Sequence, residues 1–216
     1  SSFLTVGLLL APLKIVQAET LTEEGFHQYI VELKAEALAQ GFQQALIDES
    51  FAKVKFHKRA VAADRKQPEN VETLDTYLPK RVPSWKVKKA RTLFKEHQAI
   101  LTKISNDYAV QPRFIVALWG LETNFGKFTG GYNVVSALST LAYEGRRESF
   151  FKRQLWAALT ILAEGHIKID DMKGSWAGAM GQNQFMPTSF LAYAVDGDGD
   201  GKKDIWQNQT DIFASM

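Results

Sequence analysis

The stretch PRFIVALWGLETNFG, residues 112–126, is an apolar run that ends on a glutamate and a turn. Proline suits the first turn of a helix, so the run predicts a helix over residues 112–123. This helix is apolar on most sides, which predicts that it is buried in a core. Glu122 lies seven residues after Ile115 and four after Leu118, so it shares their face.

Glu122 is the first candidate for chemistry. A carboxyl packed among Leu118, Trp119 and Leu121 would be desolvated, and desolvation favours the protonated form. Such a group can donate a proton to a leaving-group oxygen near neutral pH. The alternative is a glutamate at a helix end that reaches solvent or Lys127. The residue pattern leaves both readings open.

Composition limits the class of protein. The chain has 216 residues, 45% of them hydrophobic and 23% charged, which is typical of a globular protein. The net charge of +2 is too small to indicate nucleic-acid binding. The absence of cysteine excludes disulfides, thiolate zinc sites and a cysteine nucleophile.

Helical periodicity extends through most of the chain, and no strand-rich region or internal repeat is visible. A capping-box pattern of Thr20 and Glu23 begins the first run, and Gly41 ends it. Ser84 is placed to cap a later helix. The fold is therefore predicted to be mainly α, with helices over residues 21–40, 43–56, 85–104, 112–123 and 149–165 and a mostly extended or looped segment over residues 64–84.

The first eighteen residues have a different pattern from the rest. They are apolar and end in Val16-Gln17-Ala18, which resembles a secretory signal peptide with its cleavage site. Pro12 and Lys14 interrupt the run, so it is a poor membrane span. We expect an exported chain that starts near Glu19 and is truncated at both ends. A buried N-terminal helix is the alternative.

The stretch GSWAGAMGQNQFMPTS, residues 174–189, combines small residues with neutral hydrogen-bonding groups. The glycines and alanines allow a close approach of backbones. Ser175, Gln184 and their polar neighbours beside aromatic residues suit a sugar chain, whose hydroxyls need fixed partners. A glycine-rich turn between helices is the alternative. The spacing does not fit a G-x-S-x-G nucleophile elbow.

The stretch DGDGDGKKDIW, residues 196–206, has the spacing of an EF-hand calcium loop over its first seven positions. The twelfth position is Gln207 where a bidentate glutamate is usual, so Asp204 or Asp211 must replace it. A solvated acidic turn is the alternative. The candidate ligands that match the loop are Asp196, Asp198, Asp200 and the carbonyl of Lys202.

Three segments together resemble the lytic murein transglycosylase B family of bacterial cell-wall enzymes. They are DRKQPE (residues 64–69), ALWGLETNFGKFTG (117–130) and KGSWAGAMGQNQFMPTSFLAYAVDGDGDGKKDIW (173–206). The resemblance covers most of the chain after about residue 20. It implies cleavage of the β-1,4 bond between N-acetylmuramic acid and N-acetylglucosamine in peptidoglycan, with 1,6-anhydromuramic ends as product.

The resemblance also implies a fold and a set of residues. The fold is a lysozyme-like helical core over residues 84–216, incomplete at its C-terminus, with an EF-hand-like calcium loop. An additional N-terminal helical region with its connecting loop covers residues 19–83, after the signal peptide at 1–18. No cofactor is needed for catalysis, and the calcium is structural. The implied residues are Glu122 for catalysis, Ser175, Gln184 and Tyr77 for substrate binding, and Asp196, Asp198, Asp200, Lys202 and Asp211 for the metal.

The expected partners are peptidoglycan glycan strands and other cell-wall enzymes, with no nucleic acid. The lipid-attachment cysteine of some family members is absent, so we expect a soluble periplasmic protein without a firm membrane anchor. Two rival functions remain open. A lysozyme-type hydrolase needs a second carboxylate from Glu144, Glu148 or Glu164. A calcium-stabilised peptidoglycan-binding module needs no catalytic glutamate.

Overall fold

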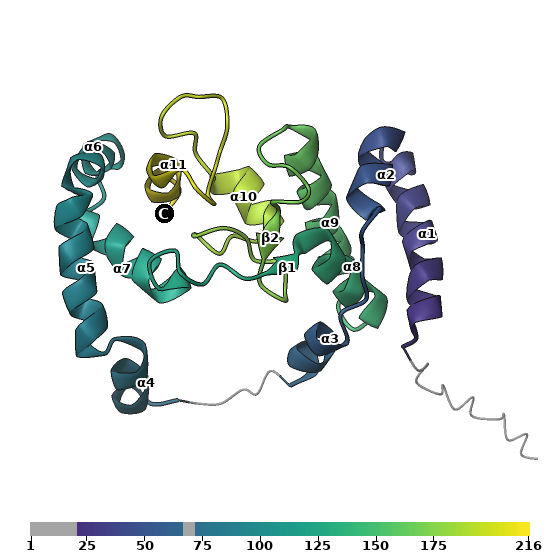
Figure 1. Ribbon diagram of the computed structural model, residues 1–216, viewed down its shortest axis with the longest axis horizontal. Helices are drawn as coiled ribbons and strands as arrows, with labels where there is room; N and C mark the ends of the chain where they lie inside the picture. The colour runs from purple at the N-terminus through teal and green to yellow at the C-terminus, as the bar shows by residue number, and fades with distance from the viewer. Residues whose placement is uncertain (1–20, 67–71) are drawn as a thin grey trace, which may run out of the picture.

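The computed structural model describes residues 21–66 and 72–216, and almost all of its regular structure is helical (Figure 1). The mainly α fold is thus confirmed. The two short strands β1 (Tyr132–Asn133) and β2 (Lys173–Gly174) pair antiparallel. The helices are α1 (Glu23–Ala39), α2 (Gln44–Phe51), α3 (Lys58–Arg65), α4 (Leu74–Arg81), α5 (Ser84–Glu96), α6 (Gln98–Tyr108), α7 (Pro112–Thr123), α8 (Val134–Glu144), α9 (Glu148–Ala163), α10 (Pro187–Tyr193) and α11 (Gln209–Ala214).

Helix α8 is the centre of the larger hydrophobic core. Every residue from Val134 to Ala142 is buried, because α1, α2, α3 and α9 all pack against this helix. Figure 1 shows these helices together on one side of the molecule. The sequence analysis did not predict α8, whose small and aliphatic residues continue directly from the loop after Glu122.

A second, smaller core joins α5, α6, α7 and α11 on the other side of the molecule. Its buried centre includes Leu101 of α6, Ile115 and Trp119 of α7, and Phe213 of α11. Trp119 and Phe213 meet edge to face with ring centroids 5.1 Å apart. The chain therefore brings residues 84–123 together with its last helix.

The predicted helix over residues 112–123 is confirmed, but its burial on all sides is wrong. Ile115 and Trp119 are buried, whereas Phe114 is 52% exposed, Leu118 41% and Leu121 46%. The physical reason is that α5, α6 and α11 cover only one side of α7. Apolar residues on the other side face solvent.

Two other expectations need correction. The helix predicted over residues 85–104 is two helices that meet at His97, whose ring packs edge-on against Trp119 and Phe213. This bend allows both α5 and α6 to contact α7. The segment predicted as extended or looped contains α4, which holds Pro79 in its interior.

The structure tests the predictions for the first two helices, but not those for the first twenty residues. Helix α1 begins at Glu23 with Thr22 as its N-cap, and the Thr22 hydroxyl accepts the N–H of Gly25 at 3.0 Å. The predicted cap Thr20 and the signal peptide at 1–18 lie outside the described residues. The helix predicted over residues 43–56 ends earlier, at Phe51. No described helix is both long and apolar enough to cross a membrane.

Candidate active site

Glu122 lies in the last turn of α7 and its side chain is exposed. Of the two readings that the sequence left open, the structure supports the glutamate at a helix end that reaches solvent, because the covered side of α7 is the other one. No ion pair between Glu122 and Lys127 forms within the described parts of the chain. Instead, Glu122 lines a depression of about 290 Å³. The other residues that line it are Lys80, Trp85, Lys86, Leu121, Thr123, Asn124 and Phe128.

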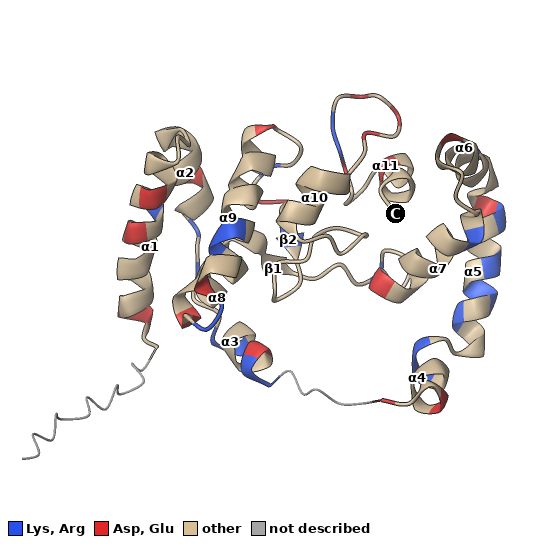
Figure 2. Cartoon of the chain, turned by 180° about the vertical axis from the view of Figure 1, so that it is seen from behind, with Lys and Arg blue, Asp and Glu red and all other residues tan. Residues whose placement is uncertain are grey.

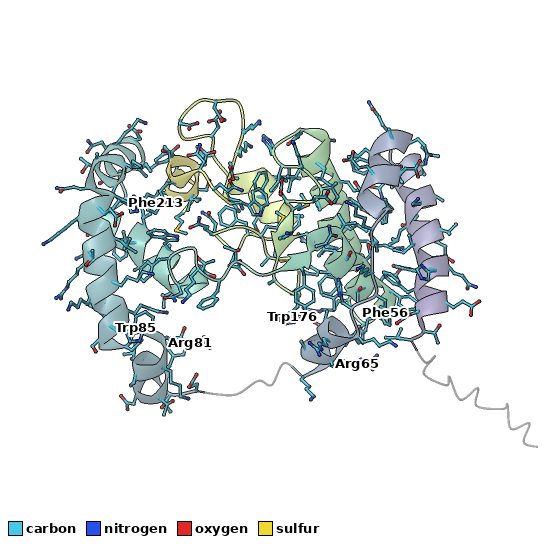
Figure 3. All side chains as sticks on the ribbon, in the orientation of Figure 1. Phe56, Arg65, Arg81, Trp85, Trp176 and Phe213 are labelled. Carbon is cyan, nitrogen blue, oxygen red and sulfur yellow. The ribbon has the colours of Figure 1, made fainter. Side chains whose placement is uncertain are left out.

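Three elements build this depression. Helix α4 contributes Lys80, the start of α5 contributes Trp85 and Lys86, and α7 with the following turn contributes the rest. Trp85 is 53% exposed, and the Lys86 ammonium lies 6.0 Å from its ring centroid. Figure 3 labels Trp85 and Arg81 together where α4 meets α5. The site thus has an aromatic face and two cations near one carboxylate.

The turn after Glu122 is strained. Asn124, Phe125 and Gly126 all have positive φ values, of 53°, 62° and 77°. Left-handed backbone at a residue other than glycine costs on the order of 1–3 kcal/mol. Packing offsets this cost, because the buried Phe125 ring lies edge-on to Trp119, with centroids 5.5 Å apart. Gly120 makes room for the ring, since a Cβ there would lie 2.8 Å from it.

Gln182 locks this turn to the rest of the molecule. Its Oε1 accepts the indole N–H of Trp119 at 2.6 Å, and its Nε2 donates to the carbonyl of Trp206 at 3.0 Å. Its own carbonyl accepts the hydroxyl of Thr123 at 3.3 Å, and that hydroxyl accepts the N–H of Gly126. Trp119 and Thr123, which lie three residues before and one residue after Glu122 on α7, are therefore both held by Gln182.

The glycine-rich segment lies against the loop after Glu122, in the kind of close backbone approach that its small residues allow. A Cβ on Gly130 would lie 2.0 Å from the carbonyl oxygen of Gly174. Gln184 bridges the same two segments, because its Nε2 donates to the carbonyls of Thr129 at 3.1 Å and Gly181 at 3.0 Å. Residues 124–131 and 174–184 thus form one connected unit.

The other residues predicted to bind substrate have local roles in this structure. The Ser175 hydroxyl accepts the N–H groups of Ala177 and Ala179, at 3.3 Å and 3.0 Å, and so stabilises its own loop. Tyr77 lies on α4, one turn before Lys80, with the Arg81 guanidinium 5.6 Å from its ring centroid. Neither residue, nor Gln184, lines the depression at Glu122.

Lys80, Trp85 and Lys86 were not predicted from the sequence. No local pattern marks them, because α4 and α5 reach Glu122 only through the packing of α5 on α7. Gln182 lies within the glycine-rich motif, where it is one of the neutral hydrogen-bonding groups expected to suit a sugar chain. Its contacts to Trp119 and Trp206 could not be inferred from that spacing.

The acidic loop has the donor set of a hard cation. Carboxylate oxygens of Asp196, Asp198 and Asp211 lie within 4.8 Å of one another. Asp204 instead accepts the N–H groups of Trp206 and Gln207, so Asp211 is the residue that completes the group. Asp200 is exposed and accepts the N–H of Lys202, and its carboxylate is not one of the three that converge.

The electrostatics of this loop fit a bound divalent ion. Asp211 is fully buried, and burial raises the pKa of its carboxyl, while the N–H groups of Asp204 and Gly197 hold it in place. Backbone N–H groups, with that of Gly201 first, lower the pKa of Asp196. No Lys, Arg or His of the described chain pairs with any of these three carboxylates. Oxygen ligands that converge without a counter-ion suit calcium.

Comparisons with known proteins agree with this fold. Membrane-bound lytic murein transglycosylase B of Escherichia coli (strain K12) is 34% identical over 131 residues, which are 60% of this chain and 36% of the relative. The crystal structure of SltB3 from Pseudomonas aeruginosa in complex with NAG-NAM-pentapeptide matches with a TM-score of 0.84 and 44% identity, over 88% of this chain and 51% of that one. The structure of the lytic transglycosylase Slt35 of Escherichia coli in complex with calcium matches with a TM-score of 0.75 and 28% sequence identity. This match covers 89% of this chain and 61% of that one.

These matches confirm the lysozyme-like helical fold that the resemblance implied. The chain spans about a third to a half of the length of the first relatives that it matches. The family described as the transglycosylase SLT domain matches residues 25–216, which is nearly the whole described chain. The chain belongs to the transglycosylase SLT domain family.

Proposed function

We propose that the protein is a lytic transglycosylase. It cleaves the β-1,4 bond between N-acetylmuramic acid and N-acetylglucosamine of peptidoglycan and leaves 1,6-anhydromuramic ends. One observation carries the proposal: Glu122 is the only carboxylate among the described residues that line its depression. Family relatives support the substrate, since SltB3 structures hold NAG-NAM-pentapeptide and NAG-anhNAM-pentapeptide. A periplasmic location is part of this proposal, because peptidoglycan lies outside the cytoplasm.

The single carboxylate argues against a lysozyme-type hydrolase. Such an enzyme needs two carboxyl groups on either side of the scissile bond. Each of the three predicted partners is engaged elsewhere and none lines the depression at Glu122. Glu144 pairs with Arg65 at 2.8 Å, Glu148 with Lys152 at 2.9 Å, and Glu164 with His166 at 3.2 Å.

One carboxyl suffices if the sugar supplies the nucleophile. Glu122 donates its proton to the glycosidic oxygen, and the C1–O bond breaks with its electron pair on that oxygen. The carbonyl oxygen of the muramyl N-acetyl group stabilises the cation at C1. Glu122, now a carboxylate, removes the proton of the C6 hydroxyl, whose oxygen bonds to C1 and closes the anhydro ring. The proton that Glu122 gave up is thereby restored.

Water must be kept from C1 for the ring to close. Because Glu122 is exposed in the free protein, the bound glycan itself has to cover the carboxyl. The exposed face of Trp85 is suited to stack on a sugar ring beside Glu122, and Lys80 and Lys86 are suited to anionic groups of the substrate. We assign Trp85 as a substrate-binding residue on this basis.

Ser175, Gln184 and Tyr77 complete the proposed binding surface. The Ser175 hydroxyl accepts two backbone N–H groups and so keeps its own proton for a sugar oxygen. The Nε2 of Gln184 is used by two carbonyls, which leaves its Oε1 as an acceptor for a substrate hydroxyl or amide. Calcium held by Asp196, Asp198 and Asp211 would be structural and would stabilise the loop that ends at Trp206, the partner of Gln182.

Mass spectrometry of digested peptidoglycan tests the proposal. The protein is expected to release fragments that end in anhydromuramic acid, and the Glu122→Gln variant, with an unchanged circular dichroism spectrum, is expected to release none. Reducing ends in place of anhydro ends would assign water as the nucleophile. Retained turnover in the variant would remove Glu122 from the mechanism, and binding without any product would favour the peptidoglycan-binding module.

A further inference from the structure

One stretch of the chain carries a local excess of cations over carboxylates. Residues 80–104 contain eight Lys or Arg and one acidic residue, Glu96, whereas the whole chain has a net charge of only +2. Figure 2 shows the Lys and Arg positions in blue along α5 and at the end of α4. The rest of the molecule is therefore net acidic, and the positive field originates from α5 and its surroundings.

Three of these cations form what we call the basic face of α5: Lys88, Arg91 and Lys95. They follow one another at intervals of three and four residues, so they lie on one side of the helix, and all three are exposed. No carboxylate of the described residues pairs with them. The two positions of α5 that line the depression at Glu122, Trp85 and Lys86, are not part of this face.

The basic face borders two depressions of different character. One, of about 530 Å³, runs along the face itself and also has the hydroxyls of Ser84 and Thr92. The other, of about 550 Å³, lies between α5 and α7 and has an apolar floor. Arg91 and Lys95 line both, and Arg113 of α7 joins them at the second. The apolar floor consists of Val87, Ala90, Phe94, Val116 and Ala117.

This combination suits a short peptide that ends in a carboxylate. The cations and hydroxyls suit the carboxylate and amide groups, and the apolar floor suits the side chains. The sugars of the intact polymer offer no negative charge to such a face, because the lactyl carboxyl of each stem-bearing N-acetylmuramic acid is joined to its peptide by an amide bond. Peptides of this kind occur on the substrate of the family, as the NAG-NAM-pentapeptide bound to SltB3 shows.

We propose that the basic face of α5 binds the carboxylate-bearing peptide stems of peptidoglycan, outside the cleft that holds the scissile bond. The inference rests on the proposed function for its choice of polymer. Glu122 acts on one glycan strand, while the basic face holds stems of the same network and keeps the enzyme on its substrate between cleavages. The contribution of such exposed charge pairs is modest and depends on salt.

Sedimentation with purified sacculi tests the proposal. All proteins carry Glu122→Gln so that the polymer stays intact. The triple variant Lys88→Gln/Arg91→Gln/Lys95→Gln is compared with Arg59→Gln/Lys66→Gln/Lys168→Gln, which removes the same charge from exposed positions elsewhere. We expect the first triple variant to bind intact sacculi about tenfold more weakly at about 0.1 M salt, and the control to bind within about twofold of the parent.

Two further substrates decide what the face recognises. The difference between the triple variants should disappear at about 1 M salt. It should also disappear on stem-free glycan, from which an amidase has removed the stems and in which the lactyl carboxylates that this cleavage frees have been converted to amides. An equal loss on stem-free glycan would overturn the proposal, as would no loss on intact sacculi. Loss of binding to anionic phospholipid vesicles, with sacculus binding unchanged, would assign the face to a lipid surface instead.

A separate readout keeps this inference distinct from the proposed function. With Glu122 restored, both triple variants are expected to cleave soluble stem-free glycan at the parent rate, because none of the six residues lines the depression at Glu122. If no form of the protein cleaves this glycan, the proposed function fails while the binding comparison still stands. Slower cleavage by the first triple variant alone would place the basic face in the cleft and overturn the proposal.

Discussion

The contacts of Gln182 predict how stability and activity depend on one side chain. In Gln182→Met the volume is nearly kept, but the Trp119 N–H and the Trp206 carbonyl lose their partners. Trp119 is buried, so its N–H gains no water, whereas Trp206 is partly exposed. Leaving a buried donor unsatisfied costs about 1–3 kcal/mol, and we therefore expect a loss of about 2 kcal/mol in the free energy of unfolding.

A double-mutant cycle isolates the bond itself. Trp119→Phe removes the donor, Gln182→Met removes the acceptor, and the double variant removes both. The double variant should be about 1 kcal/mol more stable than the sum of the two single losses predicts. The reason is that each single variant leaves one group of this hydrogen bond buried without its partner, whereas the double variant removes both groups. Urea unfolding followed by fluorescence measures this coupling. Gln28→Met, at an exposed position, serves as the control and should leave stability within about 0.5 kcal/mol of the parent.

The same cycle tests the connection to the site. Thr123, beside Glu122, bonds to the backbone of Gln182, so a shift of Gln182 should displace the carboxyl. A displacement on the order of 1 Å can cost about a hundredfold in rate, and we expect Gln182→Met to lower kcat at least tenfold with little change in KM. Additive stabilities within about 0.3 kcal/mol, or an unchanged kcat, would refute the reasoning.

The remaining predictions concern the loops, the metal, an ion pair and the site. Gly130→Ala should cost about 3 kcal/mol or more in urea unfolding, because its Cβ would meet the Gly174 carbonyl at 2.0 Å. Gly131→Ala, whose Cβ would meet nothing within 4 Å, is the matched control and should change little. Calcium at a hundred times its Kd should stabilise the protein by about 2.7 kcal/mol, and Asp198→Asn should abolish most of that gain; an unchanged Tm would contradict the metal assignment. Hydrogen bonds from Lys152 and Tyr29 lower the pKa of Glu148, so its stabilisation is present above the unfolded value near 4.5 and is lost as pH falls below it. The Tm difference between the parent and Glu148→Gln should therefore shrink in acid, and a constant difference would contradict this linkage. Finally, Trp85→Ala should raise KM for soluble glycan about tenfold or more. Stacking of a nucleobase on an aromatic side chain contributes about 1–3 kcal/mol, and we expect a sugar ring on Trp85 to gain a similar amount. An unchanged KM would remove Trp85 from the binding surface.

Local patterns predicted helices well and their surroundings poorly. The run over residues 112–123 has the period and the proline of a helix, and it is one. Its burial depends on α5, α6 and α11, and the last of these lies almost ninety residues further along the chain. The residues of α7 themselves do not show which distant helices pack against them, so the side of α7 that faces solvent could not be predicted from the sequence.

The same limit applies to the metal loop. Alternating aspartates mark the first ligands, because an EF-hand loop wraps its ion over consecutive positions. The last carboxylate comes after the loop; the spacing alone left Asp204 and Asp211 open, and the resemblance implied Asp211. The return of α11 beside the loop gives a physical reason for Asp211, whose oxygens accept N–H groups from both ends of the loop, at Gly197 and Asp204.

The exposure of Glu122 changes the physical argument for its role. A carboxyl buried in the free protein would be prepared for chemistry by desolvation alone, and it would lower stability at all times. Here the strained turn at Asn124 and Phe125 and the bonds of Gln182 fix the position of the last turn of α7, while the carboxyl itself stays in water. In the proposed mechanism, a glycan that covers the depression and fits against Trp85 would remove the carboxyl from water. The same bound strand would exclude water from C1, so a correctly seated strand would create the conditions for ring closure that an empty site lacks.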